Sequence, residues 1–458
     1  MKEVNEMSVD VREDEIVAAV HASERNWVSV EAQIDHELDP TMLFQLTEAY
    51  AGDRFYFKKN DNSASYFGYG TIKQLKNDLQ NKQSIFQEWG KYKNDIELIH
   101  PNSTYHHLRI CGGFQFSAHK ESDEWNEFGL NHFTLPEVLV TISNGISYVT
   151  YTGERQNFDI KYFKSVVEYL TQPSKHIDLD MGNVEWIEDI YKEEWRDLVK
   201  ETIAKLNDES KVVLARKRLV EFDKPINIAY ILKQAMQGEK NSYLVVLESG
   251  NSIFFSQTPE QLMEVEDEVL YTKAIAGTIS RSHDEKIDQR NIDAFLNDTK
   301  NLNEHQFVVK SILHDINPYV NAIQYNDSPK ILANDHLFHL LTEIKGDLKS
   351  ESYIGLLDNL HPTPALGGFP KERAVKYIDE HEFGTRGLYG APVGYIDMYD
   401  NCEFVVAIRS MLIKGQSATL YAGCGIVNNS NPDSEVEETA IKFTPMMKAL
   451  GVDKDDES

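Results

Sequence analysis

The sequence predicts an α+β fold in which helices cover large antiparallel sheets. Composition is the first observation behind this prediction: of 458 residues, 41% are hydrophobic and 26% are charged, as in ordinary soluble globular chains. The second is that the expected strands and helices do not alternate regularly, which disfavours a doubly wound parallel sheet. The third is that short β-type runs between polar turns fill the N-terminal region, whereas longer elements follow.

Residues 1–190 are assigned to the sheet-forming N-terminal region of this fold. Runs of β-type residues at 54–57 and 147–151 lie between polar turns. The segment Cys111-Gly112-Gly113 predicts a glycine turn or bulge that leads into a strand. No solenoid-type repeat is found, and the length predicts about two to four domains or one large one.

Residues 191–452 form the C-terminal region, and the acidic tail 453–458 is expected to be solvated and frayed. Apolar residues at helical spacing between Trp195 and Leu206 indicate an amphipathic helix. Three further helices are expected: one opening at Pro225, one with Glu304 in its first turn, and one running from Glu435 to Leu450. Strands are expected at 243–247, 252–255, 404–413 and 419–422, the last two pairing across the turn 414–417.

The negative charge of the chain excludes several classes of function. Lys and Arg number 46 against 74 Asp and Glu, which gives a formal net charge of −28. Binding to nucleic acid or to anionic lipid requires a basic surface. No apolar run approaches the ~18 residues of a membrane-spanning helix, and the start lacks the apolar core of a signal peptide. Three cysteines are too few for a disulfide scaffold. We therefore expect a cytoplasmic protein without nucleic-acid or membrane partners.

The last expected helix carries a row of charged side chains on one face. Glu435, Glu438 and Lys442 are spaced at i, i+3 and i+7, which places them on the same side of a helix. The ordinary interpretation is a solvated face with one ion pair worth ~0.3–0.5 kcal/mol. The preceding segment, which ends in a loop of small residues with Gly423 and Gly425, favours a ligand site instead, because small residues let backbone N–H groups approach a ligand.

Two residues of the C-terminal region could bind charged groups of a ligand. Arg409 interrupts an otherwise apolar run, so it either forms a structural ion pair or holds a carboxylate in its guanidinium fork. Glu304 either faces water or, with Glu438, supplies oxygen to a hard cation such as Mg²⁺. No HExxH motif or cysteine cluster accompanies Glu304, which argues against zinc.

Lys211 and Glu260 are candidates for proton transfer. Lys211 begins an apolar stretch, and a lysine in low-dielectric surroundings can lose its proton and act as a base. Its ordinary interpretation is a surface lysine. Glu260 follows a proline turn, and by itself would be assigned to solvent or to the first turn of a helix.

At these residues the sequence resembles the chorismate-utilising enzymes and, within them, the isochorismate synthases. The resemblance is strongest over residues 195–452 and looser before that. It rests on an ordered set of motifs: Lys211-Val-Val-Leu-Ala-Arg216, Thr258-Pro-Glu-Gln-Leu262, Ala274-Ile-Ala-Gly-Thr278, Asn303-Glu-His-Gln306, His361-Pro-Thr-Pro-Ala365, Gly387-Leu-Tyr-Gly-Ala-Pro-Val-Gly-Tyr395, Val406-Ala-Ile-Arg409 and Tyr421 to Lys442. The resemblance implies a β-sandwich-like core of antiparallel sheets that encloses the site.

The resemblance also implies a role for each residue. Lys211 would be the general base that activates water for addition at C2 of chorismate, and Glu260 the acid that protonates the departing C4 hydroxyl. The substrate would be held by Arg409, Lys442, Gly277, Gly423, Gly425, His339 and Ala365, with the role of His339 left open. Mg²⁺ would lie on Glu304 and Glu438, with Glu435 as a further ligand through water.

The branch within the family depends on a few positions. Aminodeoxychorismate-forming relatives carry a nucleophilic lysine where this chain has Ala276, so that covalent route is missing. Use of water instead of ammonia implies that no glutamine amidotransferase subunit is needed. An isochorismate synthase of menaquinone biosynthesis is therefore expected. A salicylate or anthranilate synthase that releases pyruvate is the alternative, and a chorismate-binding subunit without catalysis is the rival from another class.

Overall fold

The strands of this protein form one hydrogen-bonded network that divides at a single long strand, β6 (Asn131–Ser143). The computed structural model describes residues 11–77, 82–117, 123–172, 179–238, 241–282, 284–333, 337–349 and 353–452, so the predicted tail 453–458 lies outside them. One side of β6 pairs with β3 along almost its whole length. On the other side, its first residues pair with β5 and its last residues with β7. Pro136, which cannot donate a hydrogen bond, lies between these two stretches beside a bulge in β3.

The first sheet extends from β6 in both directions, and every pairing in it is antiparallel except that of β4 with β1. Its order runs from β4 through β1, β7, β6, β3, β2, β10, β11, β20, β21 and β9 to β8, with the short β17 beside β9. The bounds of its strands are β1 (Trp27–Ile34), β2 (Arg54–Lys58), β3 (Ala64–Asn77), β4 (Ile96–Ile99), β7 (Ile146–Glu154), β8 (Val184–Ile190), β9 (Lys211–Phe222), β10 (Tyr243–Ser249), β11 (Ser252–Thr258), β17 (Gly368–Phe369), β20 (Ser410–Lys414) and β21 (Ser417–Ile426).

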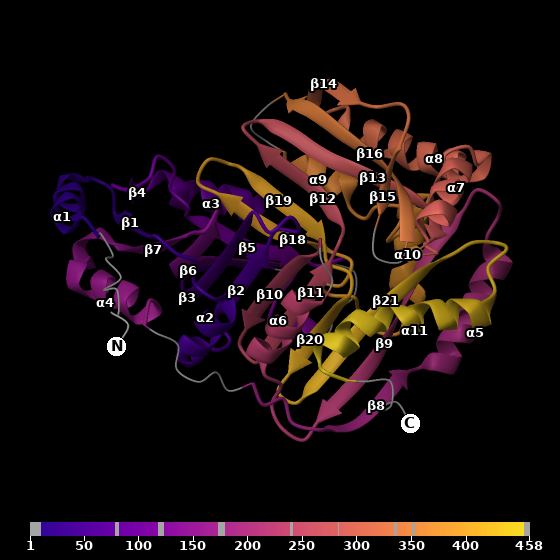
Figure 1. The fold of residues 1–458 in the computed structure, drawn as a ribbon, viewed down its shortest axis with the longest axis horizontal. Coiled ribbons are helices and arrows are strands. Elements are labelled where there is room, and N and C mark those ends of the chain that lie inside the picture. The colour runs from indigo at the N-terminus through magenta and orange to yellow at the C-terminus, as the bar shows by residue number, and fades with distance from the viewer. Residues whose placement is uncertain are drawn as a thin grey trace.

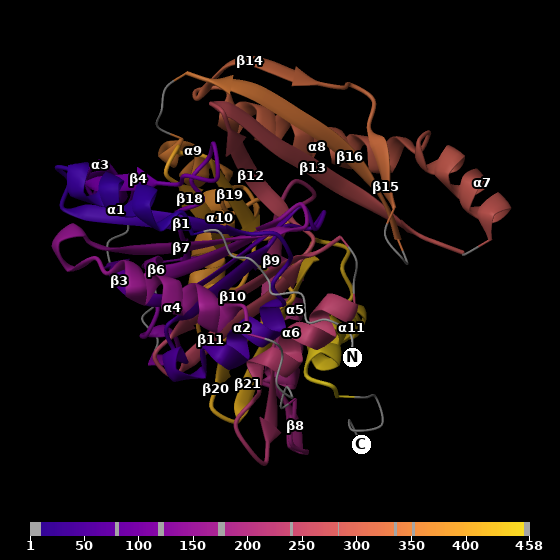
Figure 2. The ribbon, with the colours of Figure 1, turned by 60° about the vertical axis from the view of Figure 1, so that its left-hand side comes forward.

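The second sheet continues from the start of β6 through β5, β18, β19, β12 and β13 to β16. β14 and β15 both pair with β16 at its far side. In Figures 1 and 2 the strands β12 to β16 form a layer above the rest of the molecule. The bounds are β5 (Arg109–Phe114), β12 (Gln261–Glu266), β13 (Val269–Ser280), β14 (Val320–Tyr325), β15 (Lys330–Ala333), β16 (Leu337–Leu348), β18 (Pro392–Asp397) and β19 (Cys402–Val406).

Apolar side chains fill the space between the two sheets, as β10 illustrates. Tyr243, Val245 and Leu247 point into the cluster between the sheets, whereas Leu244 and Val246 point to the outer face. Alternate residues of a strand face opposite sides, so the continuous apolar run reflects burial on both faces. Across the interface, Tyr395 packs its ring 5.3 Å from that of Phe57 of the first sheet. This confirms the predicted α+β fold with a sandwich-like core.

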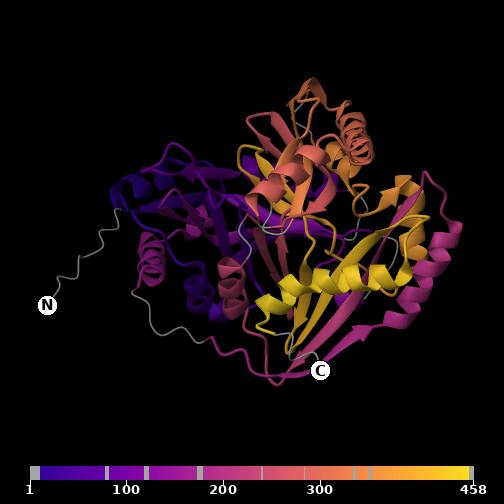
Figure 3. The same ribbon diagram turned by 45° about the vertical axis from the view of Figure 1, so that its right-hand side comes forward.

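Helices cover the outer faces and complete the hydrophobic core. The first sheet is covered by α1 (Glu13–Ala22), α2 (Pro40–Leu46), α4 (Ile160–Leu170), α6 (Ile228–Gln237) and α11 (Pro432–Ala449). The second sheet is covered by α3 (Gln83–Asn94), α8 (Thr299–Ile316) and α9 (Ile354–Leu360), while α5 (Lys192–Lys205) and α10 (Lys371–His381) pack near β9. The remaining helical elements are α7 (Glu285–Phe295), η1 (Glu48–Tyr50), η2 (Asp123–Trp125) and η3 (Arg155–Asn157). Figure 3 shows α11, the yellow helix, lying across the strands of the C-terminal half.

Two local predictions from the sequence are wrong. The helix predicted from Pro225 begins only at Ile228. Asn227 caps it, because its side-chain oxygen accepts hydrogen bonds from the backbone N–H groups of Ala229 and Tyr230. The predicted glycine turn at Gly112 is instead an internal stretch of β5. A Cβ at Gly112 would collide with the backbone of His132 in β6, so glycine is needed there for close approach of two strands.

Candidate active site

Lys211 is the first residue of β9, and it lies against β21. The two strands pair from Val212 opposite Ile426 onward. A Cβ at Gly425 would collide with the side chain of Lys211, so this glycine provides the space that the lysine occupies. Burial lowers the pKa of Lys211 and the neighbouring Lys442 acts in the same direction, while Glu304, Glu438 and Glu260 oppose both. The site therefore favours the neutral amine of Lys211 more than water would.

Glu260 lies in the connection between β11 and β12 and is partly buried. Burial raises its pKa to about 7, even though the cations Arg409, Lys211 and Lys442 act to lower it. Its backbone N–H donates to Thr258 Oγ1 at 3.2 Å, and its carbonyl accepts from Val406 N at 2.9 Å, which fixes the connection against β19. A carboxyl group with this pKa holds a proton on a large fraction of molecules at neutral pH.

Arg409 does not lie in a continuous strand, and here the prediction of one strand over 404–413 is wrong. β19 ends at Val406 in the second sheet and β20 begins at Ser410 in the first, so the chain changes sheets between them. Arg409 has a positive φ of 47°, an uncommon conformation for a residue other than glycine. Its side chain is partly exposed at the junction of the two sheets, close enough to Glu260 to influence its pKa. The predicted pairing across 414–417 is present.

The charged face of α11 borders the same place. Asn431 caps the helix by accepting hydrogen bonds from Asp433 N and Ser434 N. Lys442 Nζ donates to Glu438 Oε1 at 2.7 Å and to the carbonyl of Gly423 at 2.8 Å, which ties the helix to β21. Burial raises the pKa of the Cys424 thiol in β21, and the charge of Glu435, in the first turn of α11, acts in the same direction.

Gly423 and Gly425 lie inside β21, so the predicted loop of small residues is a strand. They lie opposite Ala215 and Val213 of β9. Ala215 N donates to Glu382, and Val213 N donates to the carbonyl of Gly367. The Val213 carbonyl accepts from Arg386, so these groups do not bond to β21. In such pairs the N–H and C=O groups point away from the partner strand. The N–H groups of both glycines are therefore directed to the edge of β21 beyond Tyr421, where β20 ends. These N–H groups could donate to a carboxylate, so the predicted ligand site remains a proposal for this edge of the strand.

Glu304 lies in the second turn of α8, not in the first as predicted, because Asp298 caps the helix one turn earlier than the apolar pattern suggests. It is exposed, and its charge acts on Lys211, as does that of Glu438. Among the described residues, no group of three or more His, Cys, Asp or Glu side chains is arranged to hold a metal ion. Two carboxylates from different helices nevertheless fit Mg²⁺, which is usually bound by one or two carboxylates together with water and substrate oxygens.

His339 of β16 pairs with Thr278 of β13, next to the bulge that contains Gly277. His339 Nδ1 lies 2.9 Å from Thr278 Oγ1 and 3.3 Å from the carbonyl of Gly277. Burial lowers the pKa of His339 and Arg409 acts in the same direction, while the hydrogen bond with the Gly277 carbonyl opposes them, so the neutral ring is favoured. Gly277 has a φ of +74° at a bulge in β13, where a side chain would be strained.

Ala365 lies in the turn between α9 and β17, and it is exposed. Two residues later, Gly367 accepts a hydrogen bond from Val213 N of β9, so this turn adjoins the start of the strand that carries Lys211.

Tyr389 is a residue to which the sequence analysis assigns no role. Its hydroxyl lies 2.8 Å from the position that a Cβ on Gly423 would take, and burial, with a smaller contribution from Glu260, raises its pKa. Tyr389 belongs to one of the sequence motifs, but its buried position emerges only from the fold.

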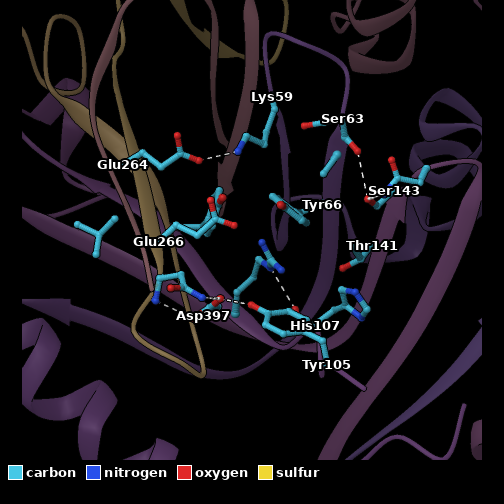
Figure 4. A pocket seen from close by; sticks show the side chains of 16 residues that line it. Lys59, Ser63, Tyr66, Tyr105, His107, Thr141, Ser143, Glu264, Glu266 and Asp397 are labelled. Carbon is cyan, nitrogen blue, oxygen red and sulfur yellow. Dashed lines mark hydrogen bonds and ion pairs between the residues drawn. The ribbon is translucent and has the colours of Figure 1, made fainter. Parts of the chain in front are cut away.

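A cavity of about 260 Å³ elsewhere in the molecule contains none of these residues (Figure 4). It lies between the β2–β3 hairpin and the strands β5, β12 and β18. Lys59 and Glu264 form an ion pair of 2.7 Å at its wall, and Tyr105 donates to Asp397. The predicted acid, base and cations converge at the edge of β9 and β21 instead, so chemistry and not cavity size identifies the candidate active site.

A carboxyl group of raised pKa, a lysine of lowered pKa, two further cations and two further carboxylates act on one another where the two sheets meet, an arrangement suited to moving protons on an anionic substrate. Among the described helices, none combines the length and apolar character needed to cross a bilayer. The chain belongs to the family of chorismate binding enzymes, whose family model matches residues 14–451.

Two curated relatives and two solved structures define this likeness further. The chain is 33% identical over 459 residues to the isochorismate synthase MenF of Bacillus subtilis, covering 95% of this chain and 97% of that protein. It is 29% identical to the salicylate biosynthesis isochorismate synthase of Pseudomonas aeruginosa, covering 92% and 90%. The fold matches the menaquinone-specific isochorismate synthase MenF of Escherichia coli with a TM-score of 0.78 at 22% identity, covering 95% and 100%. It matches anthranilate synthase component I of Streptococcus pneumoniae with a TM-score of 0.70 at 20% identity, covering 84% and 92%.

Proposed function

We propose that this protein is an isochorismate synthase, which converts chorismate to isochorismate by adding water at C2 and releasing the C4 hydroxyl. One observation carries the proposal: Lys211 and Glu260 lie in the same site with pKa values displaced toward each other, that of the amine downward and that of the carboxyl upward. Such a pair can supply a base and an acid at one pH. The relationship to curated isochorismate synthases over nearly the whole chain supports the same activity.

Substrate binding would use the cations that border the site. Chorismate carries two carboxylates, and the two cations Arg409 and Lys442 both lie close enough to Glu260 to act on its pKa. Arg409 can present two parallel N–H donors to one carboxylate. Lys442, anchored on the Gly423 carbonyl, and the N–H groups of Gly423 and Gly425 would receive the other. The ring would be lined from the opposite elements by Gly277, His339 and Ala365.

The proton transfers follow from the protonation states of the two central residues. Neutral Lys211 Nζ would accept a proton from the water that attacks C2. Protonated Glu260 would give its proton to the C4 hydroxyl, which leaves as water while the double bonds of the ring shift. Atoms balance, because one water is added and one is lost, and the product has the mass of the substrate.

Glu304 and Glu438 would hold Mg²⁺, with Glu435 reaching it through water. When bound, the ion would neutralise the ring carboxylate of the substrate. The remaining coordination positions would be filled by water and substrate oxygens, as is usual for Mg²⁺. Glu438 already pairs with Lys442, so the same carboxylate would link the cation site to the carboxylate-binding lysine.

Water as the nucleophile gives this enzyme no need for a glutamine amidotransferase subunit. At the place where aminodeoxychorismate-forming relatives use lysine, Ala276 lies in β13. We further propose that the product serves menaquinone biosynthesis, because the relatives named MenF match the chain over 95% of its length. The division of the chain into a sheet-forming region, residues 1–190, and a catalytic region, residues 191–452, belongs to the same proposal.

Incubation of the purified protein with chorismate and Mg²⁺ tests the proposal. Chromatography with mass detection and a pyruvate assay would follow the reaction. We expect a new product of unchanged mass and no pyruvate. Salicylate with pyruvate, or pyruvate formed only when ammonia is added, would assign the protein to the salicylate or anthranilate synthases. No conversion, together with a rise in melting temperature on adding chorismate, would identify a binding protein without catalysis.

A further inference from the structure

The edge of β9 next to Lys211 is completed by side chains in place of a strand. One edge of β9 pairs with β21 along its length. On the other edge, β17 pairs with residues 211–212 and β8 with residues 217–222. Among the described residues, no strand pairs with residues 213–216 on that side. Unpaired backbone groups in a protein interior cost as much as a lost hydrogen bond, so this gap needs an explanation.

Glu382 and Arg386 fill the gap. Arg386 Nη2 donates to the carbonyl of Val213 at 2.7 Å, and Ala215 N donates to Glu382 Oε1 at 2.7 Å. The two side chains also bind each other, with Arg386 Nε donating to Glu382 Oε2 at 2.9 Å. Arg386 Nη1 donates to the carbonyl of Leu366 at 2.9 Å. The ion pair therefore offers β9 one donor and one acceptor, as a neighbouring strand would.

Both side chains are almost completely buried, with exposed fractions of 7% for Glu382 and 5% for Arg386. The guanidinium also lies over the ring of Phe116, 4.3 Å from its centre. The free energy lost by removing two charges from water offsets much of their mutual attraction, and a protein with an apolar pair in their place is often as stable. General stability is therefore a weak reason for an ion pair at this position. The backbone segments that the ion pair binds are more informative about its role.

The pair connects β9 to the segment that adjoins Lys211. Leu366, bound by Arg386, immediately precedes Gly367, whose carbonyl accepts a hydrogen bond from Val213 N at 3.1 Å. Gly368 and Phe369 then pair with Val212 and Lys211. Gly368 has a φ of +120°, and a Cβ on it would collide with the carbonyl of Lys211, so the two segments approach as closely as a glycine allows.

We propose that Glu382 and Arg386 are positioning residues: acting through the backbone of β9 and the turn before β17, they fix the place of the Lys211 side chain in the site. The inference rests on the proposed function, in which Lys211 is the general base. Misplacing a catalytic group by about 1 Å can cost a factor of about 100 in rate. Loosening the edge of β9 would also let water reach Lys211.

Arg386→Lys is the primary test, because lysine keeps a positive charge against Glu382 but cannot bind Val213, Leu366 and Glu382 at once. We expect kcat to fall at least tenfold with KM for chorismate nearly unchanged. The acid limb of the kcat–pH profile should move to higher pH as water reaches Lys211. A double variant, Arg386→Met with Glu382→Met, leaves no unpaired charge and should show the same shift.

The matched control is the buried ion pair of Arg54 and Glu248, in which Arg54 Nε lies 2.8 Å from Glu248 Oε2 between β2 and β10. Arg54→Lys should lower the melting temperature and leave the kcat–pH profile unchanged. The pH dependence of Lys211 acetylation, read by peptide mass spectrometry, reports on its pKa without turnover. It should move upward in Arg386→Lys only.

Each outcome separates the two proposals. A wild-type kcat, pH profile and acetylation curve in Arg386→Lys would overturn the positioning role, even if the melting temperature falls. If the double variant does not fold, Arg386→Lys decides the matter alone. Retained turnover in Lys211→Ala would instead overturn the role of Lys211 in the proposed function. An inactive Lys211→Ala beside an unaffected Arg386→Lys would remove the positioning role and leave the proposed function intact.

Discussion

Glu260, the proposed acid, shows how burial can set the pKa of a single residue. Burial raises the pKa of its carboxyl group to about 7, although the charges of Arg409, Lys211 and Lys442 all favour the ionised form. In the unfolded chain the same group has its ordinary pKa of 4.5. The folded state therefore binds the proton more tightly than the unfolded state, and stability contributed by this proton is present at low pH. It is lost as the pH rises from about 4.5 to about 7.

Glu260→Gln should therefore be more stable than the wild type at pH 8 and equally stable at pH 4. A shift from 4.5 to about 7 corresponds to at most about 3.5 kcal/mol, since one pKa unit is about 1.4 kcal/mol. Urea unfolding at several pH values measures the difference. A constant difference across pH would show that Glu260 ionises normally. Turnover should fall by about 10² to 10⁴, the usual contribution of a general acid.

The pH dependence of the wild-type reaction tests the protonation states directly. In the proposed reaction turnover requires protonated Glu260, whose pKa burial raises to about 7, so kcat/KM should fall on the alkaline side. It also requires neutral Lys211, whose pKa is lowered by burial, so kcat/KM should fall on the acid side as well. A bell-shaped profile is the expected result. Activity that continues to rise above about pH 9 would contradict the role of Glu260 as an acid.

At the scale of the element, the proposed site depends on the two glycines that lie within β21. Gly425 leaves room for the side chain of Lys211, and a Cβ there would collide with it. Gly425→Ala should displace Lys211 and lower kcat by about tenfold or more, with the fold intact by circular dichroism. Gly90→Ala is the matched control, because a Cβ there meets no atom within 4 Å and alanine favours helix α3. Equal activity in both variants would remove the steric argument.

Helix α11 should carry the dependence on Mg²⁺ on one face only. Glu438→Gln removes a proposed ligand and the partner of Lys442, so the Mg²⁺ concentration for half-maximal activity should rise by about tenfold, as expected for loss of one of two carboxylate ligands. Glu437→Gln changes an exposed carboxylate one position along the same helix, and the Mg²⁺ requirement should stay as in the wild type. Titration of activity with Mg²⁺ at saturating chorismate compares them. Parallel shifts in both variants would indicate a general effect of charge.

The charged face of α11 and the β-type runs that become β10, β11 and part of β21 can be predicted from local patterns, because helical spacing and β-type runs are properties of short segments. The passage of the chain from one sheet to the other at Arg409 cannot be predicted from such local patterns. An apolar run such as Phe404 to Ile413 is equally compatible with one buried strand or with two strands in different sheets. The role of Glu382 and Arg386 is equally hidden, since their contacts with Val213 and Ala215 span more than 160 residues of sequence. Glu260 is accessible only through resemblance, as its burial depends on the whole fold.

At the scale of the whole molecule, the N-terminal region (residues 1–190) and the C-terminal region (residues 191–452) share their sheets. β2 of the N-terminal region pairs with β10 of the C-terminal region, and β5 pairs with β18. The cluster between the sheets mixes Phe57 with Tyr243 and Tyr395. Neither region can therefore bury its apolar strands alone, and long unpaired strand edges promote aggregation. The C-terminal region by itself should not form the site.

A fragment of residues 191–452 should accordingly be insoluble or unfolded, even though it contains every proposed catalytic and ligand-binding residue. Removal of the N-terminal region would expose the edge of β10 and that of β18, together with the inner apolar face that β2 and β5 cover. Circular dichroism and chorismate conversion of the fragment would be measured first, and thermal unfolding of the full chain would serve as the comparison. The full chain should unfold in a single cooperative transition, because neither sheet is complete without both regions. A folded fragment that converts chorismate would show instead that the catalytic region is an independent domain, and that the first 190 residues only extend its sheets.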